Sequence, residues 1–286
     1  MRDGDDVARL IVACPDRPGI IATLSTLLAE SGANIISSDQ YSTDPEGGRF
    51  FLRMEFHLER LAQQREAVEA RLRSVAGEFG MDWRISVAGV RQRVALFASR
   101  HDHCVLDLLW RRQRGELDAE IVCVVSNHPD LEKHVLPFGV PYHHVPVSPA
   151  RKAEAERNQL ELIEGRVDLV VLARYMQVLS TEFLERVGAP VINIHHSFLP
   201  AFAGPAPYAQ AHQRGVKLIG ATAHYATEDL DEGPIIEQGV ARVSHRDTPA
   251  ELARIGRDLE RVVLARAVQW HLEDRVIVDG NRTIVF

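Results

Sequence analysis

The chain has 286 residues, and its 33 Lys and Arg against 40 Asp and Glu give a formal net charge of −7 at pH 7. Its apolar share of 45% and charged share of 26% are typical of globular proteins, which excludes disordered, collagen-like and disulfide-scaffold classes. The acidic balance argues against nucleic acid as a partner. No segment has the ~18 consecutive apolar residues of a membrane span, and the acidic N-terminus is unlike a secretory signal. We therefore expect a cytoplasmic protein of two domains with no nucleic-acid or membrane partner.

Residues 1–89 are expected to form the first domain. An apolar run at 8–14 predicts a strand, followed by the turn Pro15–Gly19 and a helix over 20–31 that is stopped by Gly32. The remaining elements are two strands, a helix and a last strand, at 34–41, 49–58, 61–79 and 83–87. The order strand–helix–strand–strand–helix–strand is the ferredoxin-like α+β arrangement, with both helices on one face of an antiparallel sheet.

Residues 90–286 are expected to form a second domain in which strands alternate with helices. The predicted strands lie at 94–99, 120–126, 142–145, 167–173 and 190–194, and the helices between them at 105–114, 130–138, 151–164 and 181–187. Strands at 219–225 and 235–243, a long helix from Thr248-Pro249 and a hairpin over 275–286 complete the chain. Near-continuous apolar strands between helices predict a mostly parallel sheet covered on both faces, a Rossmann-like α/β domain with a C-terminal hairpin.

The cysteines and histidines show no spacing that binds a metal. Cys14, Cys104 and Cys123 are far apart and form no CxxC or Cys/His pattern, so we expect buried, inert thiols. For Cys104, which follows His101-Asp102-His103, a reactive thiol is the alternative. No metal is expected.

The strand at 190–194 ends in side chains that can exchange protons. Asn193 and His195 are two residues apart, so both point to one face of an extended strand, while His196 points to the other and is expected to support the loop. Ligands of open parallel sheets bind beyond the carboxyl ends of the strands, which places this pair at a candidate site. The alternative is an ordinary strand end with a core histidine.

A second stretch supplies carboxylates. The strand over 220–225 leads into an acidic loop that ends in the sharp turn Gly233-Pro234. Glu228, Asp229 and Glu232 are expected to be solvated, whereas Asp231, between Leu230 and the turn, can be drawn inward. An Asn, a His and an Asp together provide the oxyanion donor, polarising imidazole and carboxylate base of an acyl transfer.

Longer motifs around these residues carry a family resemblance. They are Asn193–Pro200 (NIHHSFLP), 230–236 (LDEGPII), His103-Cys104 with 107–110 (DLLW), 126–128 (SNH) and 280–283 (GNRT). Together they resemble the formyltetrahydrofolate deformylase family. At the N-terminus, 16–20 (DRPGI) with Asn34-Ile35 is similar to the ACT regulatory domain that this family carries. The resemblance covers essentially the whole chain.

The resemblance implies hydrolysis of 10-formyltetrahydrofolate to tetrahydrofolate and formate, a reaction that balances one-carbon pools for purine biosynthesis. It implies that Asn193, His195 and Asp231 are the catalytic trio: the first two hold the oxyanion and the third orients or deprotonates water. It also implies a pterin pocket whose residues are Arg174, Tyr175, Met176, Gln177, Val178, Leu179, Thr227, Glu228, Asp229 and Leu230. Folate is then the substrate, and no cofactor is expected.

For the first domain the resemblance implies an amino-acid effector, glycine or methionine, at an interface of a dimer or tetramer. The first N–H groups of a helix can hold a ligand carboxylate, and the turn before the predicted helix offers them. The expected effector residues are Asp16, Arg17, Pro18, Gly19, Ile20 and Asn34. A purely structural dimerisation unit is the alternative.

Two other functions stay open, a formyltransferase acting on an amine and a regulatory protein with a decayed folate site. A phosphorylated amine acceptor needs a glycine-rich turn after the first strand of the second domain, but that position reads Ser99–Cys104 with no glycine, which favours water. Pro205, Ala206 and Ala209 depart from the usual Ala, basic residue and His of the family. We expect this to weaken affinity for anionic, polyglutamylated folate and to leave local attraction to residues such as Arg174.

Overall fold

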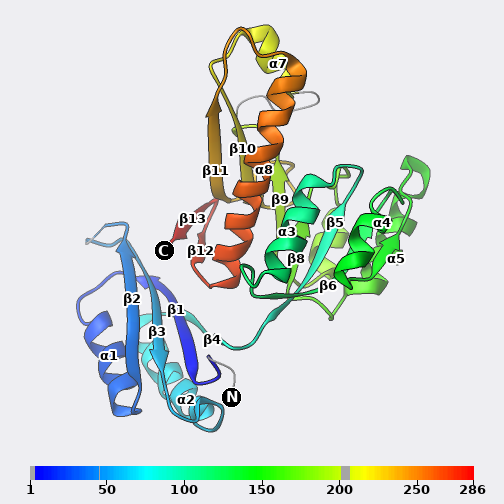
Figure 1. Cartoon of the computed structure of the whole chain (residues 1–286). Helices are drawn as coiled ribbons and strands as arrows, with labels where there is room; N and C mark the ends of the chain where they lie inside the picture. The colour runs from blue at the N-terminus through cyan, green and yellow to red at the C-terminus, as the bar shows by residue number, and fades with distance from the viewer. Residues whose placement is uncertain (1–3, 45, 201–206) are drawn as a thin grey trace. The chain divides into compact units, whose positions relative to one another are not determined.

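The computed structural model describes residues 4–44, 46–200 and 207–286, which form two compact units (Figure 1). The first comprises Met1–Arg91 with Glu273–Ile277 and Ile284–Phe286, and the second comprises Gln92–Leu272 with Val278–Thr283. This division differs from the predicted one at 89/90, because parts of the C-terminal hairpin belong to the first unit. None of the described helices is long and apolar enough to cross a membrane.

The first unit has the predicted ferredoxin-like order. Its elements are β1 (Val7–Pro15), α1 (Ile20–Glu30), β2 (Asn34–Ser42), β3 (Arg49–His57), α2 (Leu61–Phe79) and β4 (Asp82–Val87). The strands form an antiparallel sheet in the order β2-β3-β1-β4. Alternate residues of β1, Leu10 and Val12 among them, pack with Leu24, Leu28 and Leu72 of the helices, as the period of two along a strand requires.

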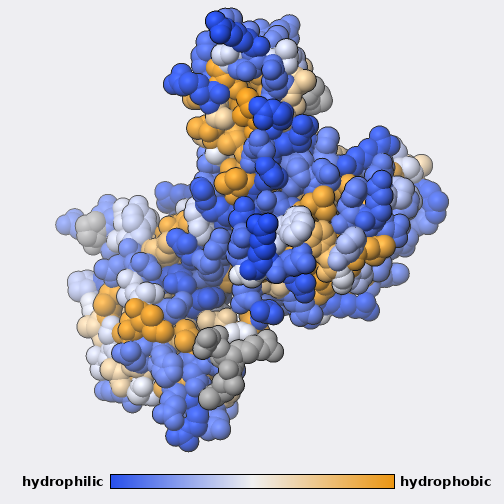
Figure 2. All heavy atoms as spheres, viewed as in Figure 1, coloured by the Kyte–Doolittle hydropathy of each residue, from blue (hydrophilic) through white to orange (hydrophobic). Residues whose placement is uncertain are grey.

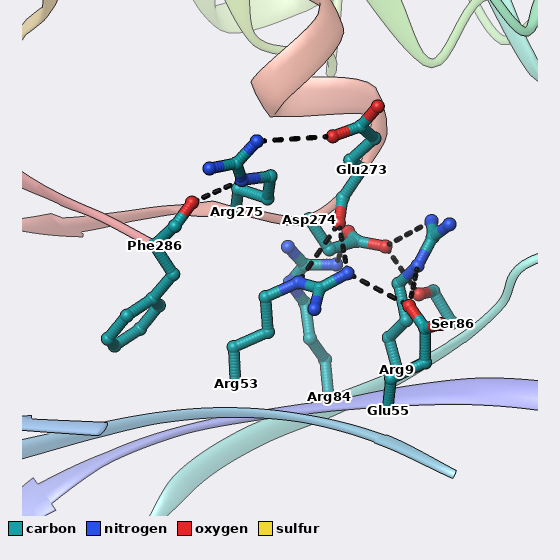
Figure 3. Close-up of polar contacts among 9 residues, drawn as sticks. All are labelled: Arg9, Arg53, Glu55, Arg84, Ser86, Glu273, Asp274, Arg275 and Phe286. Carbon is teal, nitrogen blue, oxygen red and sulfur yellow. Dashed lines mark hydrogen bonds and ion pairs between the residues drawn. The ribbon is translucent and has the colours of Figure 1, made fainter. Parts of the chain in front are cut away.

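The other face of this sheet is covered by residues 273–277 and 284–286, which include parts of the C-terminal hairpin strands β12 (Val276–Asp279) and β13 (Arg282–Val285). Ile11 and Phe51 pack there against Ile277, and all three are buried. Asp274, only 2% exposed, contacts Arg9, Arg84 and Ser86, while Arg53 donates to the main-chain oxygen of Glu273 (Figure 3). Residues 273–277 and 284–286 are therefore an integral part of the first unit.

The second unit contains a seven-stranded sheet in the order β11-β10-β9-β8-β5-β6-β7. Its strands are β5 (Gln92–Ala98), β6 (Ala119–Ser126), β7 (Tyr142–His144), β8 (Leu169–Leu172), β9 (Val191–His195), β10 (Leu218–Tyr225) and β11 (Ile235–Arg242). The helices are α3 (His103–Gln113), α4 (Glu132–Val135), α5 (Lys152–Ile163), α6 (Thr181–Arg186), α7 (Pro207–Arg214) and α8 (Pro249–Leu272), with short 3-10 turns η1 (Leu136–Phe138) and η2 (Pro149–Arg151). The five strands from β5 to β9 are parallel, and β10 and β11 are antiparallel additions, so the predicted mostly parallel sheet is confirmed.

The strand order determines where a site can form. The chain runs outward from β5 through β6 to β7 and then crosses to β8 on the other side of β5. The carboxyl ends of β5, β8 and β9 therefore lie side by side, at the switch point where open α/β sheets bind ligands.

Candidate active site

Asn193 and His195 project from the same side of β9, as their spacing predicts. The antiparallel register pairs Asn193 with His224 and His195 with Thr222 of β10. This pairing brings the Asn193 Nδ2 atom to 3.2 Å from Nε2 of His224, whose side chain is buried. Sequence reasoning missed His224, although its place two residues after Thr222 on a predicted strand put it on the same face.

Asp231 completes the group from the loop after β10. Its carboxylate Oδ2 lies 3.1 Å from Nδ1 of His195, and Oδ1 lies 3.7 Å from Nε2 of His224. Asp231 has a left-handed φ of 60°, and Gly233 lies so close to the end of β10 that a Cβ there would be 1.8 Å from the Tyr225 carbonyl oxygen. The tight return of the loop therefore places the carboxylate over the two imidazoles.

A hydrogen bond places one proton of the His224 ring. Nδ1 of His224 is 2.9 Å from the Tyr225 carbonyl, which can only accept, so Nδ1 carries a proton, and Nε2 faces the Asn193 amide and the Asp231 carboxylate. One amide hydrogen of Asn193 remains for a ligand. Burial alone raises the pKa of the Asp231 carboxyl, but interactions with His195 and His224 hold that pKa well below its usual value. Nε2 of His195 is buried with no hydrogen-bond partner among the described residues.

These groups open onto a cavity of about 400 Å³. It is lined by Leu172, Arg174, Tyr175, Met176, Gln177, Val178, Leu179, Leu184, Asn193, Ile194, His195, His196, His224, Ala226, Thr227, Glu228, Leu230 and Asp231. Of the residues predicted for a pterin pocket, Asp229 alone is absent from this lining, and it is exposed. The cavity combines apolar walls with a few convergent polar groups, the usual composition of a small-molecule site.

Arg174 and Tyr175 contribute to the wall from a buried position. The Tyr175 hydroxyl accepts from Gln159 at 2.7 Å, and burial raises its pKa to about 12. Arg174 has a left-handed φ of 63° and is 8% exposed, with Nε 3.3 Å from the Glu260 carboxylate. The charge of Arg174, which was expected to supply local attraction for an anionic ligand, is already paired with Glu260 inside the protein.

The comparisons with known proteins agree with the motifs. The sequence matches the ACT domain family over residues 8–76 and the formyl transferase family over residues 92–268. The formyltetrahydrofolate deformylase of Mycobacterium tuberculosis is 60% identical over 98% of this chain and 91% of its own length, and that of Bacillus subtilis is 54% identical over 100% and 96%. The crystal structure of the Pseudomonas syringae deformylase matches with a TM-score of 0.93 at 49% identity, covering 98% of this chain and 94% of that one.

The chain belongs to the formyltetrahydrofolate deformylase family. A glycinamide ribonucleotide transformylase from Symbiobacterium toebii has a TM-score of 0.65 at 28% identity and covers 70% of this chain. The likeness to deformylases thus extends over both units, whereas that to the transformylase covers a smaller part of the chain.

Two further sequence predictions about the deformylase can be judged. His196, which was expected to support the loop, also lines the cavity, and its ring centroid lies 5.2 Å from that of His195. Burial, with Arg174 and His195 nearby, lowers the pKa of His196 to about 4. Cys104 is 1% exposed and burial raises its thiol pKa well above the usual value, so the reactive-thiol alternative is wrong.

The predicted effector residues of the deformylase fall into two places. Asp16, Arg17, Gly19 and Ile20 line a second cavity in the first unit, together with residues of β2 and β3. Pro18 and Asn34 are not in this lining. Asn34 begins β2 opposite His57, at the far end of the strand from the Ser42 hydroxyl that donates to Asp16.

One of the three departures from the family pattern, Ala209, lies on α7. Ala209 is exposed on this helix. Pro205 and Ala206 lie outside the described residues.

Proposed function

We propose that this protein hydrolyses 10-formyltetrahydrofolate to tetrahydrofolate and formate. The observation that carries the proposal is the convergence of Asn193, His195 and Asp231 on one apolar-walled cavity, in a chain that belongs to the deformylase family. Folate acts as the substrate, and the protein's own side chains supply the reacting groups without a cofactor.

The geometry assigns a step to each group. Water attacks the formyl carbon, and the carbonyl oxygen becomes an oxyanion that accepts from the free amide hydrogen of Asn193 and from Nε2–H of protonated His195. Asp231 stabilises this imidazolium through Nδ1 and, as a persistent anion, orients the water. As the carbon–nitrogen bond breaks, His195 gives its Nε2 proton to N10 and recovers a proton from the attacking water, while Asp231 stays an anion. The products are the free amine and formic acid, which ionises to formate.

The cavity walls suit the pterin ring. Met176 and Val178 are about half exposed, at 50% and 53%, and present apolar surface, while main-chain groups of the same segment can read the edge of the heterocycle. The same walls serve the alternative reaction, transfer of the formyl group to an amine, so the acceptor must be tested directly.

Formate release tests the proposal. Wild-type protein should release formate from 10-formyltetrahydrofolate with no added amine. Asn193→Ala should lower kcat by about 100- to 1000-fold, and Asp231→Asn by at least about 100-fold. Glu232→Gln, which removes an exposed carboxylate from the same loop, should stay within about 2-fold of wild type. Wild-type rates in Asp231→Asn, or turnover only with an amine, would refute it.

We also propose that the cavity beside Asp16 and α1 binds glycine or methionine as an effector and that the deformylase is a homo-oligomer. The first turn of α1 offers main-chain N–H groups next to this cavity, and these can hold the ligand carboxylate.

An exposed apolar surface supports the homo-oligomer. Figure 2 shows apolar atoms gathered over β10 and β11, where Leu218 and Val240 are about half exposed. Calorimetry of the full chain with each amino acid, and its mass in solution by light scattering, check the two parts. No heat with either amino acid would contradict the effector proposal, and a monomeric mass would contradict the homo-oligomer.

A further inference from the structure

A buried carboxylate lies under the active site on the apolar face of α8. The residues of this face recur every three or four positions, at Leu252, Gly256, Glu260, Val263 and Ala267, and all of them are buried. Glu260 is 1% exposed. A carboxylate in such a position is costly unless it is paired, so its partners indicate what it is for.

Side chains from three different segments at the carboxyl edge of the sheet contact Glu260. Nε2 of His103, at the start of α3, is 2.6 Å from Oε2, and the Tyr208 hydroxyl of α7 donates to Oε1 at 2.7 Å. Nε of Arg174, which follows β8, lies 3.3 Å from Oε2. Glu260 therefore connects, through these three contacts, the segments that follow β5, β8 and β9.

The helix is shaped to receive Tyr208. Gly256 lies one turn before Glu260, and a Cβ at that position would be 1.9 Å from the Tyr208 hydroxyl oxygen. The bare backbone of Gly256 thus allows the ring to reach the carboxylate.

Two of the three partners lead directly to the cavity. Arg174 lines it, and Tyr208 lies with its ring centroid 6.1 Å from that of His196, which also lines it. His196 in turn contacts the ring of His195. A continuous set of packed rings thus joins Glu260 to the catalytic imidazole.

A metal ion is a poor occupant of this cluster. The ligand atoms of His103, Cys104 and Glu260 lie within 4.8 Å of one another. However, the guanidinium of Arg174 already supplies a positive charge to Glu260, and burial raises the pKa of the Cys104 thiol well above its usual value. A second cation would be repelled, so the cluster is better explained by the residues it holds.

We propose that Glu260 is a positioning residue of the deformylase reaction. It fixes Arg174 and Tyr208 beside the cavity and compensates the charge of Arg174 next to His196 and His195. The inference rests on the proposed hydrolysis, which supplies its assay.

The sign of the electrostatic effect follows from the surrounding groups. Glu260 faces His103 and Cys104 of α3, Arg174 and Tyr208. The imidazole pair faces Asp231 and His224 as well as Arg174 and Tyr208. Arg174 lowers the pKa of His196, and Glu260 opposes it. Without the Glu260 charge, Arg174 is uncompensated, and protonated imidazoles nearby become less favourable.

The experiment compares the pH profiles of kcat for wild type, Glu260→Gln, Glu260→Asp and Glu237→Gln. Glu260→Gln should lower kcat by about 10- to 100-fold and move the limb that belongs to the active-site imidazoles to lower pH by about one unit. Glu260→Asp keeps the charge and should restore the position of that limb. Glu237→Gln is the matched control, since Glu237 is 13% exposed in its side chain and pairs with Arg266 of the same helix. It should leave the profile unchanged.

The outcomes separate the positioning role of Glu260 from the proposed hydrolysis. A folded Glu260→Gln with the wild-type pH limb would overturn the positioning role, while a wild type that releases no formate would count against the proposed hydrolysis instead. If Glu260→Gln does not fold, Tyr208→Phe replaces it. Tyr208→Phe removes one hydrogen-bond donor to Glu260, so it should lower kcat by about 10-fold with little change in KM. An unchanged kcat would overturn the proposal.

Discussion

Replacing Asp274 should weaken the first unit, because this carboxylate holds the C-terminal segment on the sheet. Its side chain is 3% exposed, whereas those of its partners Arg9 and Arg84 are 17% and 51% exposed. Arg84 can regain water when the pair is broken, so its part is worth about 0–1 kcal/mol. Arg9 and Ser86 lose a buried acceptor, which costs about 1–3 kcal/mol. Asp274→Asn should therefore lower the free energy of unfolding by about 1–4 kcal/mol.

Alanine at this position should cost more than asparagine. Asp274 has a φ of 54°, in the left-handed region that Asn tolerates and that costs Ala about 1 kcal/mol. Asp274→Ala should thus destabilise by about 2–5 kcal/mol. Asp258→Asn, which removes an exposed partner of Arg254 and Arg261, should stay within about 0.5 kcal/mol of wild type.

The pH dependence provides a second check. Burial alone raises the pKa of the Asp274 carboxyl, but Arg84, Ser86 and Arg9 hold that pKa below its usual value. A depressed folded pKa stabilises the protein above the unfolded value of about 4, and the stabilisation is lost as the pH falls through the folded pKa. Urea unfolding, with hydrogen exchange on β1 and β4 peptides, should show a gap between wild type and Asp274→Asn that narrows below about pH 4. A gap under about 0.5 kcal/mol at pH 7, or one independent of pH, would refute the reasoning.

Three more substitutions test the packing around the sheet and helices. Phe97→Ala removes a fully buried ring beside Tyr175 and should destabilise by about 3–5 kcal/mol in urea unfolding. Gly220→Ala would place a Cβ 2.8 Å from Cβ of Phe198, which follows β9, so formate release and melting temperature should both fall. Gly77→Ala in α2 meets no atom within 4 Å and should raise stability by about 0.5–1 kcal/mol. The opposite sign in any of these measurements would contradict the local geometry.

The structural features that depend on local periodicity were predicted correctly from the sequence. Apolar runs separated by turn residues identified the strands of both sheets, and the period of two along β9 put Asn193 and His195 on one side. The turn at Gly233 correctly favoured Asp231 over Asp229 as the inward carboxylate, because a tight return restricts which loop position faces the sheet.

Contacts between distant parts of the chain could not be predicted in this way. His103 and Glu260 are 157 positions apart, and nothing in the helical pattern of α8 distinguishes a buried glutamate from an exposed one until its partners are known. Asn34 was grouped with the Asp16 turn by resemblance, but the pairing of β2 with β3 places it at the other end of the strand. Register between strands depends on turns and packing, which short motifs do not encode.

The division into two units also depends on contacts between distant parts of the chain, and these contacts have a measurable effect on stability. A fragment of residues 1–89 lacks Glu273–Ile277 and Ile284–Phe286, so Ile11 and Phe51 lose their cover and the arginines of the sheet lose Asp274. A fusion of residues 1–91 to residues 273–286 through a flexible linker restores both. A loss of about 3 kcal/mol shifts the melting temperature of a domain of this size by at least about 12 °C. We expect the fragment to melt that far below the fusion in scanning calorimetry; equal melting temperatures would mean that the C-terminal segment only rests on the sheet and contributes nothing to its stability.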